Sequence, residues 1–215
     1  MLFRSGTGLI NKRHVLLHCA GAASAQELLG AVSGQVAGIG TLHPLSAIAD
    51  GKAAMRALKG TVFGVEGDDV GRATATKLVA AMSGVVLGLD SAQMAAYHAA
   101  AALASNYIVA TLDAAAAVLA SAGVPADQAA QALVPLAEGA LKNVAAHGTT
   151  GGLTGPIRRG DKATVQRHLD AIRDRPELAD IYRVLARRAV DIAGRLEGRE
   201  APDRAALDAI KQLLG

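Results

Sequence analysis

The sequence has little cysteine and few aromatic residues. Cys19 is the one cysteine among 215 residues, tryptophan is absent, and aromatic residues make up 2% of the chain. A lone cysteine excludes an internal disulfide and a cysteine-based zinc site, which fits a reducing, cytoplasmic setting. Because few rings can stack on bases and the net charge is only +3, we expect no nucleic-acid partner.

Two longer patterns are also missing. No run of 18 or more apolar residues is free of polar ones, so the sequence predicts no membrane association. No Gly-x-Gly-x-x-Gly follows a predicted strand, since Gly6 and Gly8 have no strand before them and no third glycine at the required spacing. The chain therefore lacks the glycine-rich loop that holds pyrophosphate in dinucleotide-binding domains.

Apolar residues are abundant and make up 51% of the chain. Their spacing follows one pattern in the first third of the chain and another from residue 91 onward. The first third alternates short apolar runs with helical periodicity, which is typical of βαβ units in a mainly parallel sheet. The predicted strands cover residues 15–18, 36–42, 61–65 and 85–89, and the helices between them cover 25–32, 52–58 and 69–82.

From residue 91 onward only helices are predicted, over residues 92–122, 126–146, 162–172, 176–196 and 202–214, with a glycine-rich loop over 147–156. The predicted fold class is α/β followed by all-α. The corresponding domains are residues 1–90 and residues 91–215.

Three polar side chains interrupt the alanine-rich helix that begins near residue 92. At about 100° per residue, Ser105 lies within roughly 20° of His98 around the helix axis, and Asn106 lies within about 80°. Polar groups on a buried helix face need partners. The stretch is therefore either a satisfied internal network or one wall of a site.

Residues that follow predicted strands are candidates for a site, because ligands of parallel sheets bind at the carboxyl ends of the strands. His43 follows the strand predicted to end at residue 42, where it could exchange a proton with a substrate or simply pack on the helical segment. His18, Cys19 and Gly21 follow the first strand in the same way. Small residues there allow close approach of a ligand, Ser24 can cap the next helix, and Cys19 is expected to pack as a small apolar residue.

Two further clusters have competing interpretations. The acidic residues 66–69 could bind a metal, but acids at a helix start more often stabilise its N-terminus, and we predict no metal site. The loop with Thr154, Arg158 and Arg159 offers donors suited to a carboxylate or phosphate. The alternative is an ordinary connection between helices with Asp161 as N-cap.

Five motifs, taken in order, resemble one family, the Rossmann-like oxidoreductases whose helical C-terminal part is the domain of unknown function 2520. The motifs are His18-Cys19-x-Gly21-Ala22, Leu42-His43-Pro44-Leu45, Gly60-x-x-Phe63-x-Val65-Glu66-Gly67-Asp68, Tyr97-His98-Ala99-Ala100-Ala101-x-x-Ala104-Ser105-Asn106 and Leu153-Thr154-Gly155-Pro156-Ile157-x-Arg159-Gly160-Asp161.

The resemblance implies a Rossmann-like domain that binds NADP and a helical domain similar to those of 6-phosphogluconate dehydrogenase and ketopantoate reductase. In such relatives the helical domain commonly forms a homodimer, and the substrate lies between the domains. The His43-Pro44 step also resembles the His-Pro motif of prephenate dehydrogenases. The family's glycine-rich loop is absent here, so we expect an N-terminally truncated Rossmann-like domain that does not bind NADP unaided.

Roles follow from motif position and chemistry. His43 and His98 are the candidate proton donors in hydride transfer to or from a small oxo acid, hydroxy acid or imine. Ser105 and Asn106 would orient that substrate.

The remaining candidate residues would bind the substrate or the cofactor. Thr154 and Arg159 would hold the acidic group of the substrate, and His18, Cys19 and Gly21 would lie on the cofactor side. The alternative function is a non-catalytic helical module for dimerisation or small-ligand binding.

Overall fold

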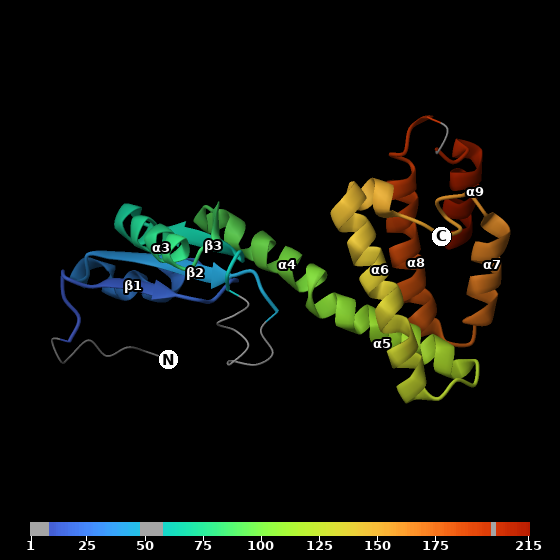
Figure 1. The fold of residues 1–215 in the computed structure, drawn as a ribbon, viewed down its shortest axis with the longest axis horizontal. Helices are drawn as coiled ribbons and strands as arrows, with labels where there is room; N and C mark the ends of the chain where they lie inside the picture. The colour runs from blue at the N-terminus through green and yellow to red at the C-terminus, as the bar shows by residue number, and fades with distance from the viewer. Residues whose placement is uncertain (1–8, 48–57, 199–200) are drawn as a thin grey trace. The chain divides into compact units, whose positions relative to one another are not determined.

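The computed structural model describes residues 9–47, 58–198 and 201–215. The chain forms two compact units, residues 1–108 (unit 1) and residues 109–215 (unit 2). Strands lie in unit 1 and helices alone form the described part of unit 2, so the predicted order of α/β followed by all-α is confirmed (Figure 1). The last strand ends at Gly88, whereas the division between the units lies within helix α5.

Unit 1 contains a four-stranded sheet in the order β1-β2-β3-β4. The strands are β1 (Val15–His18), β2 (Gly38–Pro44), β3 (Val62–Gly67) and β4 (Val85–Gly88). The pairs β1–β2 and β3–β4 are parallel as predicted, but β2 and β3 are antiparallel. The local apolar pattern of a strand does not encode its direction, which is set by the connecting chain. The helix predicted over 52–58 falls almost wholly on residues 48–57, outside the described part.

Helix α3 (Asp69–Ala81) covers one face of this sheet (Figure 1). It packs Ala75 and Val79 against Phe63 and Val65 of β3, and all four side chains are buried. Asp68 caps the helix by accepting a hydrogen bond from the Gly71 amide at 2.7 Å. The acidic run at residues 66–69 thus contains an N-cap, as the sequence favoured.

The helix predicted over 25–32 is shorter than expected. Helix α1 (Ala25–Leu29) is followed directly by the 3-10 turn η1 (Gly30–Gln35). Ser24 caps α1 in a capping box with Glu27, which confirms its predicted role.

The single helix predicted over residues 92–122 was wrong in one respect, because it is interrupted. A 3-10 turn, η2 (Ser91–Gln93), leads into α4 (Met94–Ala104), and α5 (Asn106–Ser121) follows. Ser105 lies between them with φ −127° and ψ −77°, outside the helical region. Serine and asparagine compete for backbone hydrogen bonds and favour helix ends over helix interiors. Angles measured around one straight axis therefore do not extend to Ser105 and Asn106.

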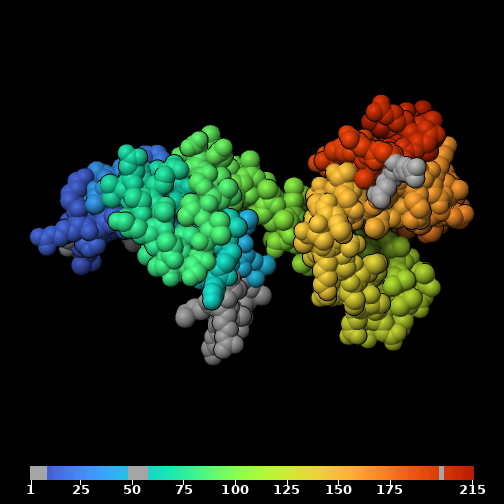
Figure 2. All heavy atoms as spheres, turned by 45° about the horizontal axis from the view of Figure 1, so that its top comes forward, coloured from blue at the N-terminus to red at the C-terminus, as the bar shows by residue number. Residues whose placement is uncertain are grey.

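Unit 2 contains the rest of α5 and the helices α6 (Ala126–Gly152), α7 (Lys162–Ala171), α8 (Pro176–Ala193) and α9 (Arg204–Leu214). Its apolar core lies among α7, α8 and α9, whose atoms, coloured orange to red, pack side by side in Figure 2. Val165, Val190 and Ile210 are among the buried residues of that core.

The loop predicted to begin at residue 147 begins later. Helix α6 continues to Gly152, with a local break at Gly148, where φ is +69° and ψ is 178°. Glycine reaches this backbone conformation without steric cost, so the chain bends at Gly148 and then resumes the helix.

Candidate functional site

A cavity of about 920 Å³ lies in unit 1, between the carboxyl end of β2 and helix α4. Four residues predicted as site residues line it, namely His43, His98, Ser105 and Asn106. The break after α4 therefore does not carry Ser105 and Asn106 away from His98. Tyr97 also lines the cavity, and most other lining residues are alanines. The cavity is large enough for a small ligand and presents few polar groups to it.

His43 lies within strand β2, not in a loop as the sequence predicted. It pairs in register with Gly64 of β3, and Pro44 pairs with Phe63. The pairing of β2 with β1 ends at Thr41, opposite His18, so the missing N–H of Pro44 costs no hydrogen bond to β1. The strand backbone holds the His43 ring more firmly than a loop would.

The ring of His43 is paired with Tyr97 of α4. Its Nδ1 lies 2.8 Å from the Tyr97 hydroxyl oxygen, and the two rings meet edge to face with centroids 5.5 Å apart. The Tyr97 hydroxyl also donates to the backbone oxygen of His43 at 3.3 Å. Tyr97 is only 9% exposed, so these contacts are shielded from solvent.

His98 is the second imidazole of the cavity, with its centroid 5.9 Å from that of His43. Partial burial lowers the pKa of His43 below its usual 6.5, and the nearby His98 lowers it further. The His43 ring is therefore uncharged at neutral pH and able to accept a proton. His98 is exposed to solvent.

Gly21 packs against the imidazole rings of His43 and His98. A Cβ atom built on Gly21 would lie 2.7 Å from Cδ2 of His98 and 2.8 Å from both Cε1 and Nε2 of His43. Only glycine fits here without displacing a ring. The loop after β1 thus reaches the site, and the bare backbone of Gly21 lies beside the Cε1–Nε2 edge of His43.

His18 has both ring nitrogens engaged within unit 1. Its Nδ1 accepts from the Ala20 amide at 3.2 Å, so Nε2 carries the proton and donates to the Thr41 hydroxyl at 3.0 Å. Thr41 in turn donates to Glu66 Oε2 at 3.0 Å. Both ring nitrogens of His18 are thus engaged within unit 1, and its role on the cofactor side stays a prediction.

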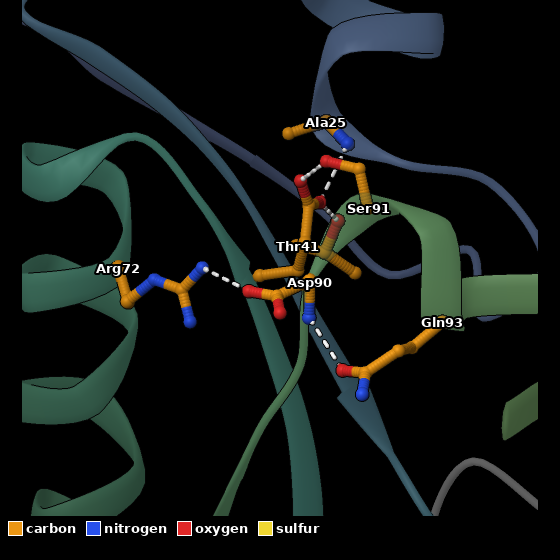
Figure 3. Close-up of polar contacts among 7 residues, drawn as sticks. Ala25, Thr41, Arg72, Asp90, Ser91 and Gln93 are labelled. Carbon is orange, nitrogen blue, oxygen red and sulfur yellow. Dashed lines mark hydrogen bonds and ion pairs between the residues drawn. The ribbon is translucent and has the colours of Figure 1, made fainter.

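Glu66 is the centre of this buried network. Three donors converge on its carboxylate, as Figure 3 shows for the labelled Ala25, Thr41 and Ser91. The Ala25 amide donates to Oε2 at 2.8 Å and the Ser91 hydroxyl donates to Oε1 at 2.7 Å. Through these bonds Glu66 connects the starts of α1 and η2 to the sheet. The side chain is buried, with 3% of its surface exposed.

The helix starts that follow β1 and β3 do not fit a pyrophosphate. At α1 the Ala25 amide is bound to Glu66, and at α3 the Gly71 amide is bound to Asp68. A phosphate at either place would displace a carboxylate from its amide and meet its negative charge. The described residues of unit 1 therefore build no cradle for a dinucleotide at these two positions.

Cys19 is exposed, so the expectation that it packs as a small apolar residue was wrong. It follows the last residue of β1, beyond the sheet that would have covered it. No group of three or more His, Cys, Asp or Glu residues within the described ranges could hold a metal ion.

The two candidates of unit 2 lie in the connection between α6 and α7. Thr154 and Arg159 are exposed there. Arg158 instead donates to the backbone oxygens of Gly151 and Leu153, at 3.2 and 2.9 Å, so it holds the connection together. Asp161 caps α7 through the Thr164 amide at 3.0 Å, which is the N-cap of the alternative interpretation.

Sequence reasoning assigned no role to Tyr97, Gly64 or Thr41, and did not separate Glu66 from its acidic neighbours. The available signal for Tyr97 was its place beside His98, as a large residue with a hydroxyl in an alanine-rich helix. Gly64 and Thr41 gave none, because their importance depends on which strands are neighbours.

Comparison with known proteins gives a family and a fold. The model of the family described as "Domain of unknown function (DUF2520)" matches residues 61–189, more than half of the chain. A search of curated proteins gives no match.

Two solved structures are similar to this chain. One is a protein from Thermotoga maritima, with a TM-score of 0.71 and 25% identity over 83% of this chain and 68% of that one. The other is a "putative NADP oxidoreductase" from Bacteroides fragilis, with a TM-score of 0.64 and 23% identity over 81% of this chain and 64% of that one. The chain spans about two thirds of the length of each, and both share its fold.

Proposed function

Because the chain belongs to the family of domain of unknown function DUF2520, we propose that it provides the substrate-binding part of an NAD(P)-dependent oxidoreductase. The substrate class is a small hydroxy acid, oxo acid or imine. The name of the Bacteroides fragilis structure supports NADP as the cofactor. The observation that carries the proposal is an uncharged imidazole, His43, held by β2 at the wall of a cavity of about 920 Å³.

His43 would exchange the proton of the substrate. An uncharged ring accepts the proton of a hydroxyl as that hydroxyl is oxidised, and the resulting imidazolium returns a proton in the opposite direction. Its lowered pKa suits the first of these steps at neutral pH. Hydride transfer is the chemistry that the nicotinamide would supply, and the starts of α1 and α3, where carboxylates accept from the Ala25 and Gly71 amides, do not fit its pyrophosphate. The proposal therefore concerns the substrate side alone.

Other lining residues would bind and orient the substrate. His98 is exposed to the cavity and would bind an acidic group when protonated, while Ser105 and Asn106 offer a hydroxyl and an amide. The roles of Thr154 and Arg159 in holding the acidic group, those of Cys19 and Gly21 near the cofactor, and the cytoplasmic location stay predictions.

Binding of small acids tests this proposal directly. Isothermal titration with pyruvate, lactate and larger 2-oxo and 2-hydroxy acids should give saturable binding to the wild-type protein by at least one of them. His98→Ala should weaken that binding about tenfold, equivalent to about 1.4 kcal/mol. His147→Ala, at an exposed histidine on α6, is the matched control and should leave binding unchanged. Absence of binding by every acid, or equal loss in the control, would contradict the proposal.

A titration with NADPH, followed by its fluorescence, tests the cofactor side separately. We expect no saturable binding by this chain, because its own carboxylates occupy the amides at the starts of α1 and α3. Tight binding would show that the cofactor uses other residues.

We also propose that unit 2 forms a homodimer through α5 and α6, because these helices bury little of their apolar surface. No residue of α5 is buried, and in α6 only Ala129 and Gly152 are. Val109 is 69% exposed and Leu136 is 71% exposed. A face of alanines and aliphatic residues can pack closely on a second copy of itself.

A membrane offers a different cover for part of this surface. Residues 91–121 form the one described helical stretch that is long and apolar enough to cross a membrane, and none of its most apolar window is buried. A helix that pairs with a second copy passes the same test, so this finding alone is weak evidence for a membrane span.

The molar mass in solution distinguishes these possibilities. Light scattering after size exclusion should give twice the chain mass without detergent, and Leu136→Glu should shift the protein toward monomer. Ala163→Glu, which adds the same charge at an exposed site on α7, should leave the dimer intact. A monomeric wild type, or a need for detergent, would overturn the dimer. A dimer that binds no acid would favour the non-catalytic dimerisation module.

A further inference from the structure

We propose that Tyr97 is a positioning residue for His43, which keeps the ring proton on Nδ1 and presents the lone pair of Nε2 to the cavity. This inference rests on the proposed function, in which His43 takes a proton from the substrate.

The hydrogen-bond geometry determines which nitrogen carries the proton. A tyrosine hydroxyl has one hydrogen to donate. The Tyr97 oxygen lies 3.3 Å from the backbone oxygen of His43, which can only accept, and 2.8 Å from Nδ1. Both contacts are hydrogen bonds at the same time only when the hydroxyl donates to the backbone oxygen and the ring donates from Nδ1. Nδ1 therefore carries the proton, and Nε2 is left as an acceptor.

The fold holds Tyr97 in place for this task. Its hydroxyl end lies against Gly64, the cross-strand partner of His43 in the β2–β3 pair. A Cβ at Gly64 would lie 2.8 Å from both Cζ and the hydroxyl oxygen of Tyr97. The room for the hydroxyl therefore exists only because the residue opposite His43 is glycine.

His18 has the other tautomer, with its proton on Nε2. His18 and His43 therefore differ in which ring nitrogen carries the proton. At His18 the Ala20 amide donates to Nδ1, so the proton is on Nε2, which points to Thr41. His18 is thus fixed with its proton directed inward. His43 has the opposite tautomer in our proposal, with its proton on Nδ1 beside the Tyr97 oxygen and Nε2 left as an acceptor.

This arrangement serves proton exchange in both directions without rotation of the ring. When Nε2 takes the proton of a substrate hydroxyl, the Nδ1 proton remains bonded to the Tyr97 oxygen. When the imidazolium gives the proton back, the same neutral form is restored. Burial raises the pKa of Tyr97, and the Gly64 backbone offsets part of that rise, so the hydroxyl stays protonated in the neutral range.

Nitrogen NMR of the histidine rings tests the proposal on the wild-type protein alone. Long-range proton–nitrogen spectra of protein labelled with ¹⁵N in histidine would be recorded without substrate at about pH 8, above the ordinary histidine pKa. His43→Gln assigns the His43 signals by their loss. We expect a pyrrole-type shift at Nδ1 of His43 and a pyridine-type shift at Nε2. The reverse pattern would overturn the proposal, whatever any variant does.

Tyr97→Phe and Tyr182→Phe form a matched pair of variants, because the Tyr182 hydroxyl lies 2.9 Å from Nδ1 of His168. Tyr97→Phe should remove the pyrrole-type signal from Nδ1 of His43, and Tyr182→Phe should alter the His168 signals alone. An unchanged His43 pattern in Tyr97→Phe would contradict the positioning role. Since these spectra need no ligand, failure here is distinct from failure of the proposed function, which would appear as absence of acid binding.

Discussion

Among the described residues, a histidine–tyrosine pair lies in each unit, and these two pairs have nearly the same geometry. In unit 1 the Nδ1 of His43 lies 2.8 Å from the Tyr97 hydroxyl, with ring centroids 5.5 Å apart at 89°. In unit 2 the corresponding values for His168 and Tyr182 are 2.9 Å, 5.8 Å and 88°. The contact alone therefore does not distinguish a candidate site from an ordinary surface pair.

The surroundings distinguish them. His43 lies on a strand beside a second imidazole and the bare backbone of Gly21, at a cavity of about 920 Å³. His168 is exposed on α7, at a smaller apolar pocket of about 340 Å³ between α5, α7 and α8. A second histidine, a ring held by Tyr97 and a few polar groups on the cavity wall make chemistry possible in unit 1. In unit 2 the same pair joins two helices.

The largest expected effect concerns the buried network that supports unit 1. Glu66→Ala would leave the Ala25 amide and the hydroxyls of Thr41 and Ser91 without their acceptor. We expect a loss of about 3 kcal/mol in the free energy of unfolding, measured by urea denaturation. Glu138→Ala, at an exposed glutamate on α6, should change it by less than about 0.5 kcal/mol. Similar losses in both variants would show that Glu66 has no special structural role.

A smaller effect is expected where the loop after β1 meets the two imidazoles. In Gly21→Ala the new methyl group would displace the ring of His43 or His98, at a cost of about 2 kcal/mol and with loss of acid binding. Gly139→Ala is the matched control, because a Cβ there meets no atom within 4 Å. In helix α6 it should stabilise the protein by up to about 1 kcal/mol. Unchanged stability and binding in Gly21→Ala would show that the loop does not close on the site.

Removing each tyrosine hydroxyl compares the two pairs directly. Tyr97→Phe should cost about 1 kcal/mol in unfolding free energy, because its contacts with His43 are buried. Tyr182→Phe should cost less than about 0.5 kcal/mol, since His168 is exposed and water can replace the lost partner. Equal costs would remove the distinction drawn between the pairs.

The smallest effect is on the pH dependence of stability. The folded chain lowers the pKa of His43 below 6.5, so in acid the unfolded chain binds a proton that the folded chain does not. The free energy of unfolding should therefore fall as the pH falls from 6.5 to the folded pKa of His43, and level off below it. His43→Gln should flatten this part of the curve, and His147→Ala should not. The same slope in wild type and His43→Gln would contradict the assignment.

Much of the fold was predictable because it depends on local sequence. Strand and helix positions follow from apolar periodicity, and the caps at Ser24 and Asp161 follow from short hydroxyl and carboxylate side chains before a helix. The antiparallel β2–β3 pair was not predictable in this way, because strand direction depends on the path of the chain between strands.

The site was predictable only in part for the same reason. His43 and His98 stand out in sequence as polar residues in apolar surroundings, and both line the cavity. The environment of His43 is non-local. Tyr97 lies 54 residues away in the chain, and Gly64 becomes important only through strand register. Periodicity in the sequence cannot predict contacts between residues so far apart in the chain. The role of Tyr97 as the partner of the His43 ring is therefore evident only from the structure.

The two histidine–tyrosine pairs should differ in ligand binding, because we expect the cavity at His43 to bind a small acid and the pair in unit 2 to bind none. The most direct test is a titration of the histidine-labelled protein with the tightest-binding 2-oxo or 2-hydroxy acid, followed by the ring signals of all assigned histidines. We expect saturable shifts of the His43 and His98 signals with one common dissociation constant, and no shift of the His168 signals. Unmoved His43 and His98 signals, or His168 signals that move equally, would contradict it.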